Sequence, residues 1–361
     1  MNLPLLYDWR KLQLFCESVF IRAGVPPAYA ATVAESLVEA DLRGVDSHGV
    51  VRTSIYLKRV VAGRIQPEAT PEIVSDGTAT VLLDGRNNFG SVVGMKALSI
   101  ACERAERHGV CVVGVKNSNH FGTGAFYALK AIERNLGLMV MSNASQTMPP
   151  TGGVRPFLGT NPLAVGFPAG EELPFLLDMA TSVVARGKII VASQKGESIP
   201  LGWAVDKHGN PTTNADEALE GSVLPVGGPK GYAISMFIDI LSGVLTGAGY
   251  GSSVNNMYEN WKEDQNVGHM FLAFDIGKFM PIDQFKRRMD HYIRSIKAEP
   301  KAEGVSEILI PGELEHRKTV ERKRDGILLP AKVVQELYDI GEQYGVPLAP
   351  AACELYEGKT S

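Results

Sequence analysis

The stretch Val110-Cys-Val-Val-Gly-Val-Lys-Asn-Ser-Asn-His-Phe-Gly-Thr-Gly124 joins three kinds of local sequence. Residues 110–115 are apolar and mostly β-branched, which is typical of a buried strand. Residues 116–124 are polar, and a helical apolar pattern follows over 124–134. A second strand is predicted at 136–141. Strands that alternate with helices predict an α/β or α+β fold.

The same alternation continues on both sides of this stretch. Further strands are predicted at 80–83, 163–166, 175–179, 270–274 and 307–310. Further helices are predicted at 92–107, 183–194, 231–245 and 281–296. Both chain ends are helical in pattern, with predicted helices that begin after Asp8 and cover 28–43, 50–61 and 330–344. We therefore expect residues 1–75 and 311–361 to form a discontinuous helical domain around an α/β domain over 76–310.

Composition limits the classes of function. Of 361 residues, 45% are hydrophobic and 21% are charged, as in an ordinary soluble globular protein. The net charge of −4 offers no basic excess for nucleic acid or for an anionic membrane. The apolar run 231–250 contains Asp239, which favours a buried helix over a membrane span. In that run Gly243 and Gly247 are spaced for close packing against another helix.

Cysteine usage and the N-terminus predict a cytoplasmic protein. The four cysteines form no C-x-x-C pair, and three of them lie in apolar patterns that suggest buried thiols. The first ten residues show no basic segment followed by an apolar one, so we expect no secretory signal.

Several familiar motifs are missing. No G-x-G-x-x-G follows a predicted strand, so the dinucleotide fingerprint of the Rossmann fold is absent. Gly-Gly-Pro-Lys at 227–230 is not a P-loop, because proline precedes the lysine and no Ser or Thr follows it. The seven histidines form no pair at metal-ligand spacing, and we therefore expect no metal site.

The segment Arg43-Gly-Val-Asp-Ser-His-Gly-Val-Val-Arg52 is the first candidate site. If the chain is helical after Ser47, His48 and Arg52 lie four residues apart on one face. A guanidinium can bind a substrate carboxylate with two parallel hydrogen bonds, and a nearby imidazole can exchange a proton with the adjacent oxygen. The alternative is structural: Ser47 caps a helix, and His48 and Arg52 lie at the surface.

His120 marks the second candidate site. It lies in a polar cluster after a buried strand, where α/β proteins often place reactive groups. The alternative is a turn whose Asn side chains bond the backbone.

Two further loops, 159–163 and 177–182, combine small polar residues with a following helix. Their backbone N–H groups could hold phosphate, and Asp178 could bond a ribose. An N-capped helix is the structural alternative. Lys230 and the turn Pro311-Gly-Glu313 are weak signals when each is taken alone.

Taken together, these segments resemble the malate/L-lactate dehydrogenase family that is unrelated to the Rossmann-type enzymes of the same names. This family includes ureidoglycolate dehydrogenase, diketogulonate reductase, sulfolactate dehydrogenase and Δ1-piperideine-2-carboxylate reductase. Seven stretches match it in order, so the resemblance covers nearly the whole chain. They are 43–52, 118–122, 159–164, 178–182, 199–203 with 211–213, 230–232 and 311–313.

The resemblance implies an oxidoreductase that uses NAD or NADP, with a largely antiparallel cofactor-binding sheet covered by helices. It also implies a homodimer in which both chains build each active site. By position, His48 and His120 become the candidate acid/base residues, with Ser47 and Arg52 for substrate. The stretches that match cofactor contacts contain Ser145, Asn161, Pro162, Asp178, Met179, Ala180, Thr181, Lys230, Gly231, Pro311, Gly312 and Glu313. The sequence departs from the family pattern at Gln146, where proline is usual, and at Ala233, where glycine is common.

The expected reaction is hydride transfer between nicotinamide and a small 2-hydroxy acid or 2-keto acid such as malate or lactate. We favour His120 as the acid/base residue because the preceding strand can hold it, and His48 stays the alternative. Two other functions stay open: an imine reductase that acts on a cyclic 2-carboxylate, and a ligand-binding relative without turnover. The substrate, the direction favoured in cells and the choice between NAD and NADP are open at this point.

Overall fold

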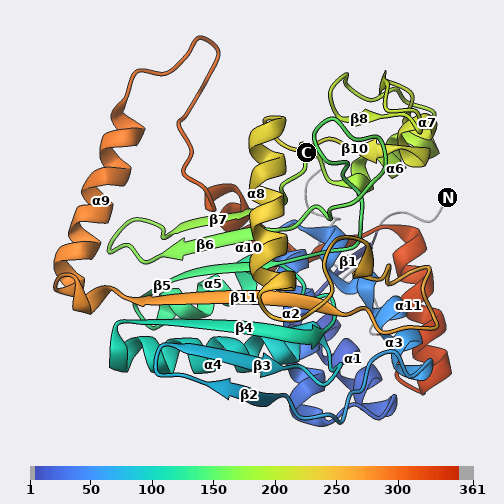
Figure 1. Cartoon of the computed structure of the whole chain (residues 1–361), viewed down its shortest axis with the longest axis horizontal. Coiled ribbons are helices and arrows are strands. Elements are labelled where there is room, and N and C mark those ends of the chain that lie inside the picture. Colours follow the sequence, from blue (N-terminus) through green and yellow to red (C-terminus); the bar gives the residue numbers. More distant parts are fainter. Residues whose placement is uncertain (1–4, 349–361) are drawn as a thin grey trace, which may run out of the picture.

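The computed structural model describes residues 5–348, so the predicted domain parts at 1–4 and 349–361 lie outside the described residues. Its centre is a seven-stranded sheet (Figure 1). In spatial order the strands are β2 (Glu72–Asp76), β3 (Thr80–Asp84), β4 (Val110–Ser118), β11 (Val267–Asp275), β5 (Leu136–Ser142), β6 (Leu163–Phe167) and β7 (Phe175–Met179). Only β3 and β4 pair in parallel, which confirms the prediction of a largely antiparallel sheet.

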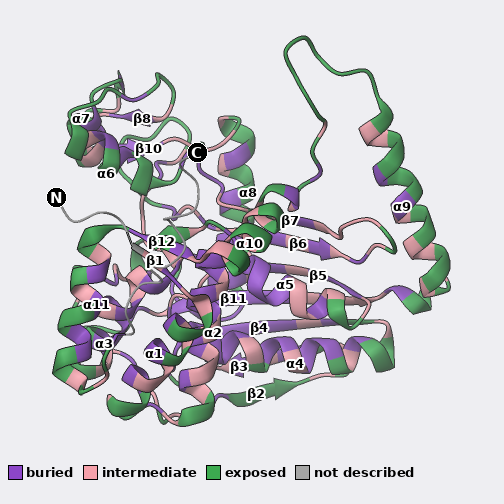
Figure 2. Ribbon diagram, turned by 180° about the vertical axis from the view of Figure 1, so that it is seen from behind, coloured by how far each residue is buried: buried purple, intermediate pink, exposed green. Residues whose placement is uncertain are grey.

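Helices cover the two faces of this sheet unequally. On one face, α4 (Gly90–His108) and α5 (Gly124–Glu133) bury alternate strand residues such as Val113, Leu138 and Phe271 (Figure 2). On the other face, α8 (Pro229–Asp239) packs through Ile238 against Met141 and Met270. The helix α9 (Ile282–Ala298) projects from one end of the sheet (Figure 1).

Both chain ends contribute to one helical region beside the sheet. It contains α1 (Trp9–Arg22), α2 (Pro27–Leu42), α3 (Thr53–Val61), α10 (Glu313–Asp325), α11 (Ala331–Tyr344) and the pair β1 (Leu5–Tyr7) with β12 (Ile327–Leu329). As expected, Asp8 caps α1, since its carboxylate accepts the N–H groups of Arg10 and Lys11. Phe15 and Leu37 share one core with Ile327 and Leu337. This shared core supports the predicted division at residues 75 and 311, which stays a prediction.

A small unit with its own core completes the described fold. It contains α6 (Arg186–Lys195), α7 (Ala215–Glu220) and a three-stranded sheet of β8 (Ala204–Val205), β9 (Pro211–Thr212) and β10 (Ser222–Val223).

No helix among the described residues is long and apolar enough to cross a membrane.

Two predicted elements differ in the structure. Residues 307–310 are not a strand, because they pair with no sheet and lead into α10, which the sequence did not signal. This helix is highly charged and lacks an apolar stripe. The predicted helix over 231–245 begins at Pro229 and ends in a π-helical turn at Ile240–Val244. Gly243 there lies against Gly249 and Asn143 of the same chain, so its interpretation as a contact with another helix is wrong.

Asp290 attaches α9 to the turn between β6 and β7. Its carboxylate accepts the N–H groups of Gly170, Glu171 and Glu172 at 2.9, 3.0 and 3.1 Å. Replacement by alanine should lower the free energy of unfolding by about 1.5–3 kcal/mol, the usual effect of losing bonds to a charged group. Thermal unfolding measures this change. The control is Gln284→Ala at an exposed position of α9, and an equal shift of Tm in both variants would contradict the assigned role.

Candidate functional site

The segment from Asp46 to Arg52 forms two short 3₁₀ turns between α2 and α3, and not the continuous helix considered above. Asp41 of α2 anchors it, because Oδ2 accepts the N–H of Val50 at 2.8 Å. Burial raises the pKa of Asp41 to about 8. A Cβ at Gly49 would lie 1.7 Å from Oδ1 of Asp41, so only glycine fits there. From α10, Arg322 pairs with Asp46.

Ser47 links the other two candidate residues of this segment. Its Oγ lies 2.9 Å from Nδ1 of His48, and its carbonyl accepts the Nε–H of Arg52 at 2.6 Å. The Arg52 guanidinium lies over the ring of Tyr258, with Cζ 5.5 Å from the ring centre. Its two terminal nitrogens make no hydrogen bond to any described residue. They are therefore free to bind a carboxylate with two parallel hydrogen bonds, and we call this pair of nitrogens the Arg52 fork.

The structure brings His120 against this segment. The rings of His48 and His120 are 5.2 Å apart and tilted by 32°. Nδ1 of His120 lies 2.7 Å from the hydroxyl of Tyr56 on α3. The backbone N–H of His120 donates to Oε1 of Gln265 at 2.8 Å. Two motifs that are distant in the sequence thus form one site, in which Tyr56 holds the imidazole of His120 and Gln265 holds its backbone.

Both imidazoles are neutral at pH 7. Burial lowers the pKa of His48 to about 4, and the charge of Arg52 adds to this effect. Burial also lowers the pKa of His120 well below its usual value, with Arg52, His48 and His269 as further causes. A neutral imidazole with a free nitrogen can accept a proton from a substrate hydroxyl.

Asp178 lies close to residues 119–123, which join β4 to α5 and which we call the His120 loop. On β7, the Asp178 carboxylate accepts the N–H of Ala125 at 2.8 Å, at the start of the helix that follows this loop. Desolvation by neighbouring protein groups raises the pKa of Asp178 to about 6, although part of the residue is exposed. The hydroxyls of Thr181 and of Thr123 are buried without a hydrogen-bond partner. Buried hydroxyls of this kind fit a site that is completed by a polar ligand.

Lys230 and Gly231 open α8, where the backbone can receive an anion. The preceding Gly227 and Gly228 have φ of +61° and +62°, and no atom lies within 4 Å of a Cβ placed at either. No side chain caps this helix, and Lys230 is exposed in its first turn. A free helix N-terminus, an open glycine pair and a lysine suit a phosphate group. These residues therefore fit a phosphate-bearing cofactor such as NAD or NADP.

Other predicted cofactor residues make contacts within the chain, and their role toward a cofactor stays a prediction. Fully buried Asn161 accepts the N–H of Ala144 and donates to the carbonyl of Ser235, so it links the Ser145 loop to α8. The carbonyl of Pro162 accepts the N–H of Ser142, at 3.3 Å.

The turn at Pro311–Glu313 joins α10 to β7. The Pro311 carbonyl accepts the N–H of Leu176, and Gly312 lies against the same residue. The Glu313 carboxylate of this turn is paired with Lys297. Met179, Ala180 and Ser145 are half-buried, and Ser145 makes no side-chain hydrogen bond to a described residue. Gln146, the departure noted above, donates to the Gly251 carbonyl at 2.9 Å.

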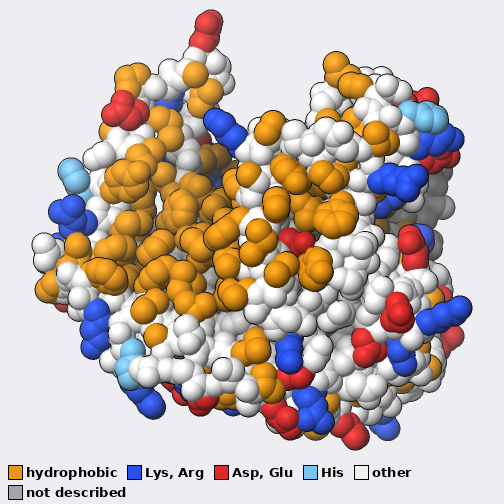
Figure 3. Space-filling model, in the orientation of Figure 1, with side chains coloured by type: hydrophobic (Ala, Val, Ile, Leu, Met, Phe, Trp, Pro, Cys, Tyr) orange, Lys and Arg blue, Asp and Glu red, His pale blue; other side chains and the backbone are white. Residues whose placement is uncertain are grey.

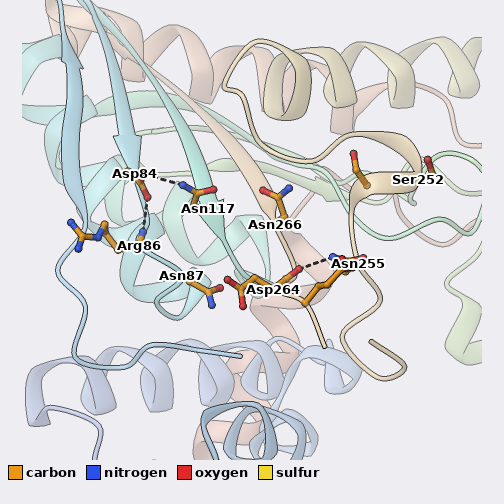
Figure 4. A pocket seen from close by; sticks show the side chains of 10 residues that line it. Asp84, Arg86, Asn87, Asn117, Ser252, Asn255, Asp264 and Asn266 are labelled. Carbon is orange, nitrogen blue, oxygen red and sulfur yellow. Dashed lines mark hydrogen bonds between the residues drawn. The ribbon is translucent and has the colours of Figure 1, made fainter. Parts of the chain in front are cut away.

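Two cavities border the site. One of about 380 Å³ reaches Ser47, Arg52, Lys58, Tyr258 and Glu336. A larger one of about 780 Å³ lies behind the His120 loop, and its polar wall includes Asp84, Asn117, Asn255, Asp264 and Asn266 (Figure 4). None of the predicted site residues lines the larger cavity. Within residues 5–348, no three His, Cys, Asp or Glu side chains are grouped to hold a metal ion.

Sequence reasoning missed three residues at this site: Tyr56, Gln265 and His269. Tyr56 follows Arg52 by four residues on a predicted helix, and this spacing could have found it. Gln265 precedes β11 and His269 lies on it, so both reach the His120 loop from far along the chain, and nothing local in the sequence signals that contact.

Comparison with known proteins supports the geometric picture. The model of the family described as malate/L-lactate dehydrogenase matches residues 7–338. The malate dehydrogenase of Pyrococcus abyssi is 41% identical over 340 residues, which cover 92% of this chain and 93% of that protein. The structure of sulfolactate dehydrogenase from Methanocaldococcus jannaschii superposes with a TM-score of 0.90 at 39% identity, over 95% of this chain and 98% of that one.

A third similar structure is Δ1-piperideine-2-carboxylate reductase from Pseudomonas syringae. Its TM-score is 0.83 at 27% identity, over 93% of this chain and 99% of that one. The matched motifs, the unusual sheet and the family model agree over nearly the whole chain. This chain belongs to the malate/L-lactate dehydrogenase family of oxidoreductases.

Proposed function

We propose that this protein is an NAD- or NADP-dependent dehydrogenase that interconverts a small 2-hydroxy acid, such as malate or lactate, and its 2-keto acid. One observation supports this proposal most: the free Arg52 fork lies in the same site as the neutral imidazoles of His48 and His120. A carboxylate on the fork would place the adjacent hydroxyl near an imidazole.

Each side chain has a distinct role in this proposal. Arg52 binds the substrate carboxylate, and Ser47 holds Arg52 and His48 in place through its carbonyl and hydroxyl. His120 takes the hydroxyl proton as the C–H bond breaks and the C=O bond forms, and it returns that proton in reduction. When bound, the nicotinamide ring accepts or supplies the hydride at C4.

Tyr56 supports the choice of His120 over His48 as the acid/base residue. If Nδ1–H of His120 donates to the Tyr56 oxygen, Nε2 is left bare and can accept a proton. Tyr56 also fixes the plane of the ring. His48, with Nδ1 next to the Ser47 hydroxyl, would then orient the substrate.

For the cofactor, we propose that the N-terminus of α8 with Lys230 and Gly231 receives phosphate. The segment from Asp178 through Met179 and Ala180 to Thr181, together with Ser145, would contact the nucleoside and nicotinamide parts. The contact from Ala125 to Asp178 supports this arrangement, because it places that segment beside the His120 loop. The described cysteines, Cys16, Cys102 and Cys111, are free and buried, which supports the proposed cytoplasmic location.

We also propose a homodimer in which each active site is shared. Hydrophobic side chains gather over α8, the open face of the sheet and α9 (Figure 3). We call this surface the apolar face. Its exposed members on α8 and the turn that follows are Ile234, Met236, Phe237, Ile240, Val244 and Leu245, with 41–65% of each residue exposed. A contiguous apolar surface of this kind usually marks a protein interface. A second copy of the chain would cover it.

The reaction is tested with purified protein, NAD and NADP, and a panel of 2-hydroxy acids, 2-keto acids and Δ1-piperideine-2-carboxylate. Arg52→Lys keeps the charge but loses the fork, and should lower kcat/KM about 10- to 150-fold, which corresponds to about 1.5–3 kcal/mol. Arg64→Lys, at a surface ion pair with Asp264, is the control and should leave kcat/KM unchanged. Turnover of the cyclic imine alone would favour an imine reductase, and no turnover of any compound would favour a non-catalytic relative.

The two histidines should respond differently to replacement. His120→Ala should lower kcat by about 10²- to 10⁴-fold, whereas His48→Ala should mainly raise KM. Because the pKa of His120 is lowered, kcat/KM for oxidation should rise with pH only below about 6.5 and stay level through neutral pH. For reduction, which needs the protonated ring, kcat/KM should fall as pH rises through the same range. The opposite pattern of kcat and KM effects would assign proton transfer to His48.

The dimer is tested by sedimentation. Phe237→Asp places a charge in the apolar face, and it should give a monomer with little activity. Leu14→Asp alters an exposed leucine on α1, away from that face, and should sediment as the wild-type protein does. A wild-type protein that is monomeric and fully active would contradict the shared site.

A further inference from the structure

His269 occupies the centre of the sheet below the His120 loop. It lies on β11, between β4 and β5, and is fully buried. Its Nε2 is 2.8 Å from the Ser118 hydroxyl on β4, and its Nδ1 is 2.9 Å from the Ser142 hydroxyl on β5. A polar triplet that crosses an otherwise apolar sheet face is costly to bury unless each member is bonded, as here.

A β-bulge brings Ser118 to this face. On β4, the odd-numbered residues 111, 113 and 115 face the helical core, and regular alternation would turn Ser118 to the opposite side. The pairing with β11 shifts register after Val115, and Asn117 adopts a positive φ of 53°. Asn117 therefore points into the large polar cavity toward Asp84 (Figure 4), and Ser118 turns inward to His269.

The hydrogen bonds of the two serines favour one tautomer of His269. The Ser142 hydroxyl donates to the carbonyl of Asn143 at 2.9 Å, so toward His269 it acts as the acceptor of Nδ1–H. Nε2 is then bare and accepts the hydroxyl proton of Ser118. The competing acceptor for Ser118, the carbonyl of Asn119, lies farther away at 3.5 Å. The two serines thus make opposite bonds to one neutral ring.

His269 also holds the other side of the His120 loop. Its ring stacks on Phe121, with centres 4.6 Å apart and planes within 11°. Phe121 in turn stacks on Tyr127, whose hydroxyl donates to the Phe121 carbonyl at 2.6 Å. Both Ser118 and Phe121, which flank His120, therefore rest on the same imidazole.

We propose that His269 is a positioning residue for the acid/base histidine. It acts through Ser118 and Phe121 to hold the His120 loop in one conformation, so that Nε2 of His120 faces the substrate. Ser142 bonds the opposite edge of the His269 ring, and its hydroxyl makes no hydrogen bond to a described residue of the His120 loop. This inference rests on the proposed role of His120.

A matched pair of variants tests the proposal. Ser118→Ala and Ser142→Ala each remove one hydroxyl from the same ring, and both should lower Tm by a similar amount. Ser118→Ala should lower kcat about 10- to 100-fold, as expected when a reacting group is misplaced. Its KM for the hydroxy acid, its Kd for the cofactor and its pH inflection should stay near wild type, because Arg52 and His120 are retained. Ser142→Ala should keep kcat within about twofold of wild type.

Replacement of His269 itself gives a second, independent comparison. A glutamine amide reaches the place of Nε2 and can still accept from Ser118, whereas an asparagine amide reaches only the place of Nδ1. His269→Gln should therefore retain more of the wild-type kcat than His269→Asn. If Ser118→Ala does not fold, this comparison tests the positioning role of His269 by itself.

Equal loss of kcat in the two serine variants, or loss in neither, would overturn the proposal, as would a higher kcat for His269→Asn than for His269→Gln. A fully active His120→Ala would instead overturn the proposed role of His120 as the acid/base residue, on which this inference rests. If His120→Ala is inactive and the serine variants are alike, only the role of His269 is wrong.

Discussion

The hydrogen bond between the Tyr56 hydroxyl and Nδ1 of His120 joins the helical region to the sheet at the point where the chemistry is proposed. One partner belongs to α3, which follows the Ser47–Arg52 segment, and the other to the loop after β4. This contact directly links the two motifs that form the site. The anchoring of that segment by Asp41 and of the His120 loop by Gln265 serves the same contact from its two sides.

The electrostatics of the site follow from burial. Two imidazoles and a guanidinium are close together, and no carboxylate within residues 5–348 bonds to them, so this arrangement disfavours additional positive charge. It keeps both imidazoles neutral and leaves the fork of Arg52 unsatisfied. A bound substrate carboxylate would supply the missing negative charge. The substrate carboxylate that Arg52 binds would thus also favour protonation of a neighbouring imidazole. Reduction of a keto acid requires that protonated ring.

The two faces of the sheet have different roles, because helices cover them unequally. The face under α4 and α5 is an apolar core, and it shields the polar triplet of Ser118, His269 and Ser142 from water. The other face is covered in part by α8 and leaves a broad apolar surface. One face thus supports the catalytic loop, and the other is available to a second copy of the chain.

Local sequence determined much of this protein: the strands and helices around 80–180, the helical chain ends, the absence of a Rossmann fingerprint, and the roles proposed for His48, Arg52 and His120. These rest on periodicity, capping and motif chemistry, which act over a few residues. Only the tertiary structure decided that His48 touches His120, that a charged segment without an apolar stripe forms α10, and that Asn161 and Glu313 have structural partners. It also revealed Tyr56, Gln265 and His269. Their contacts join residues far apart in the chain, and such contacts depend on strand order and on a bulge that no local pattern encodes.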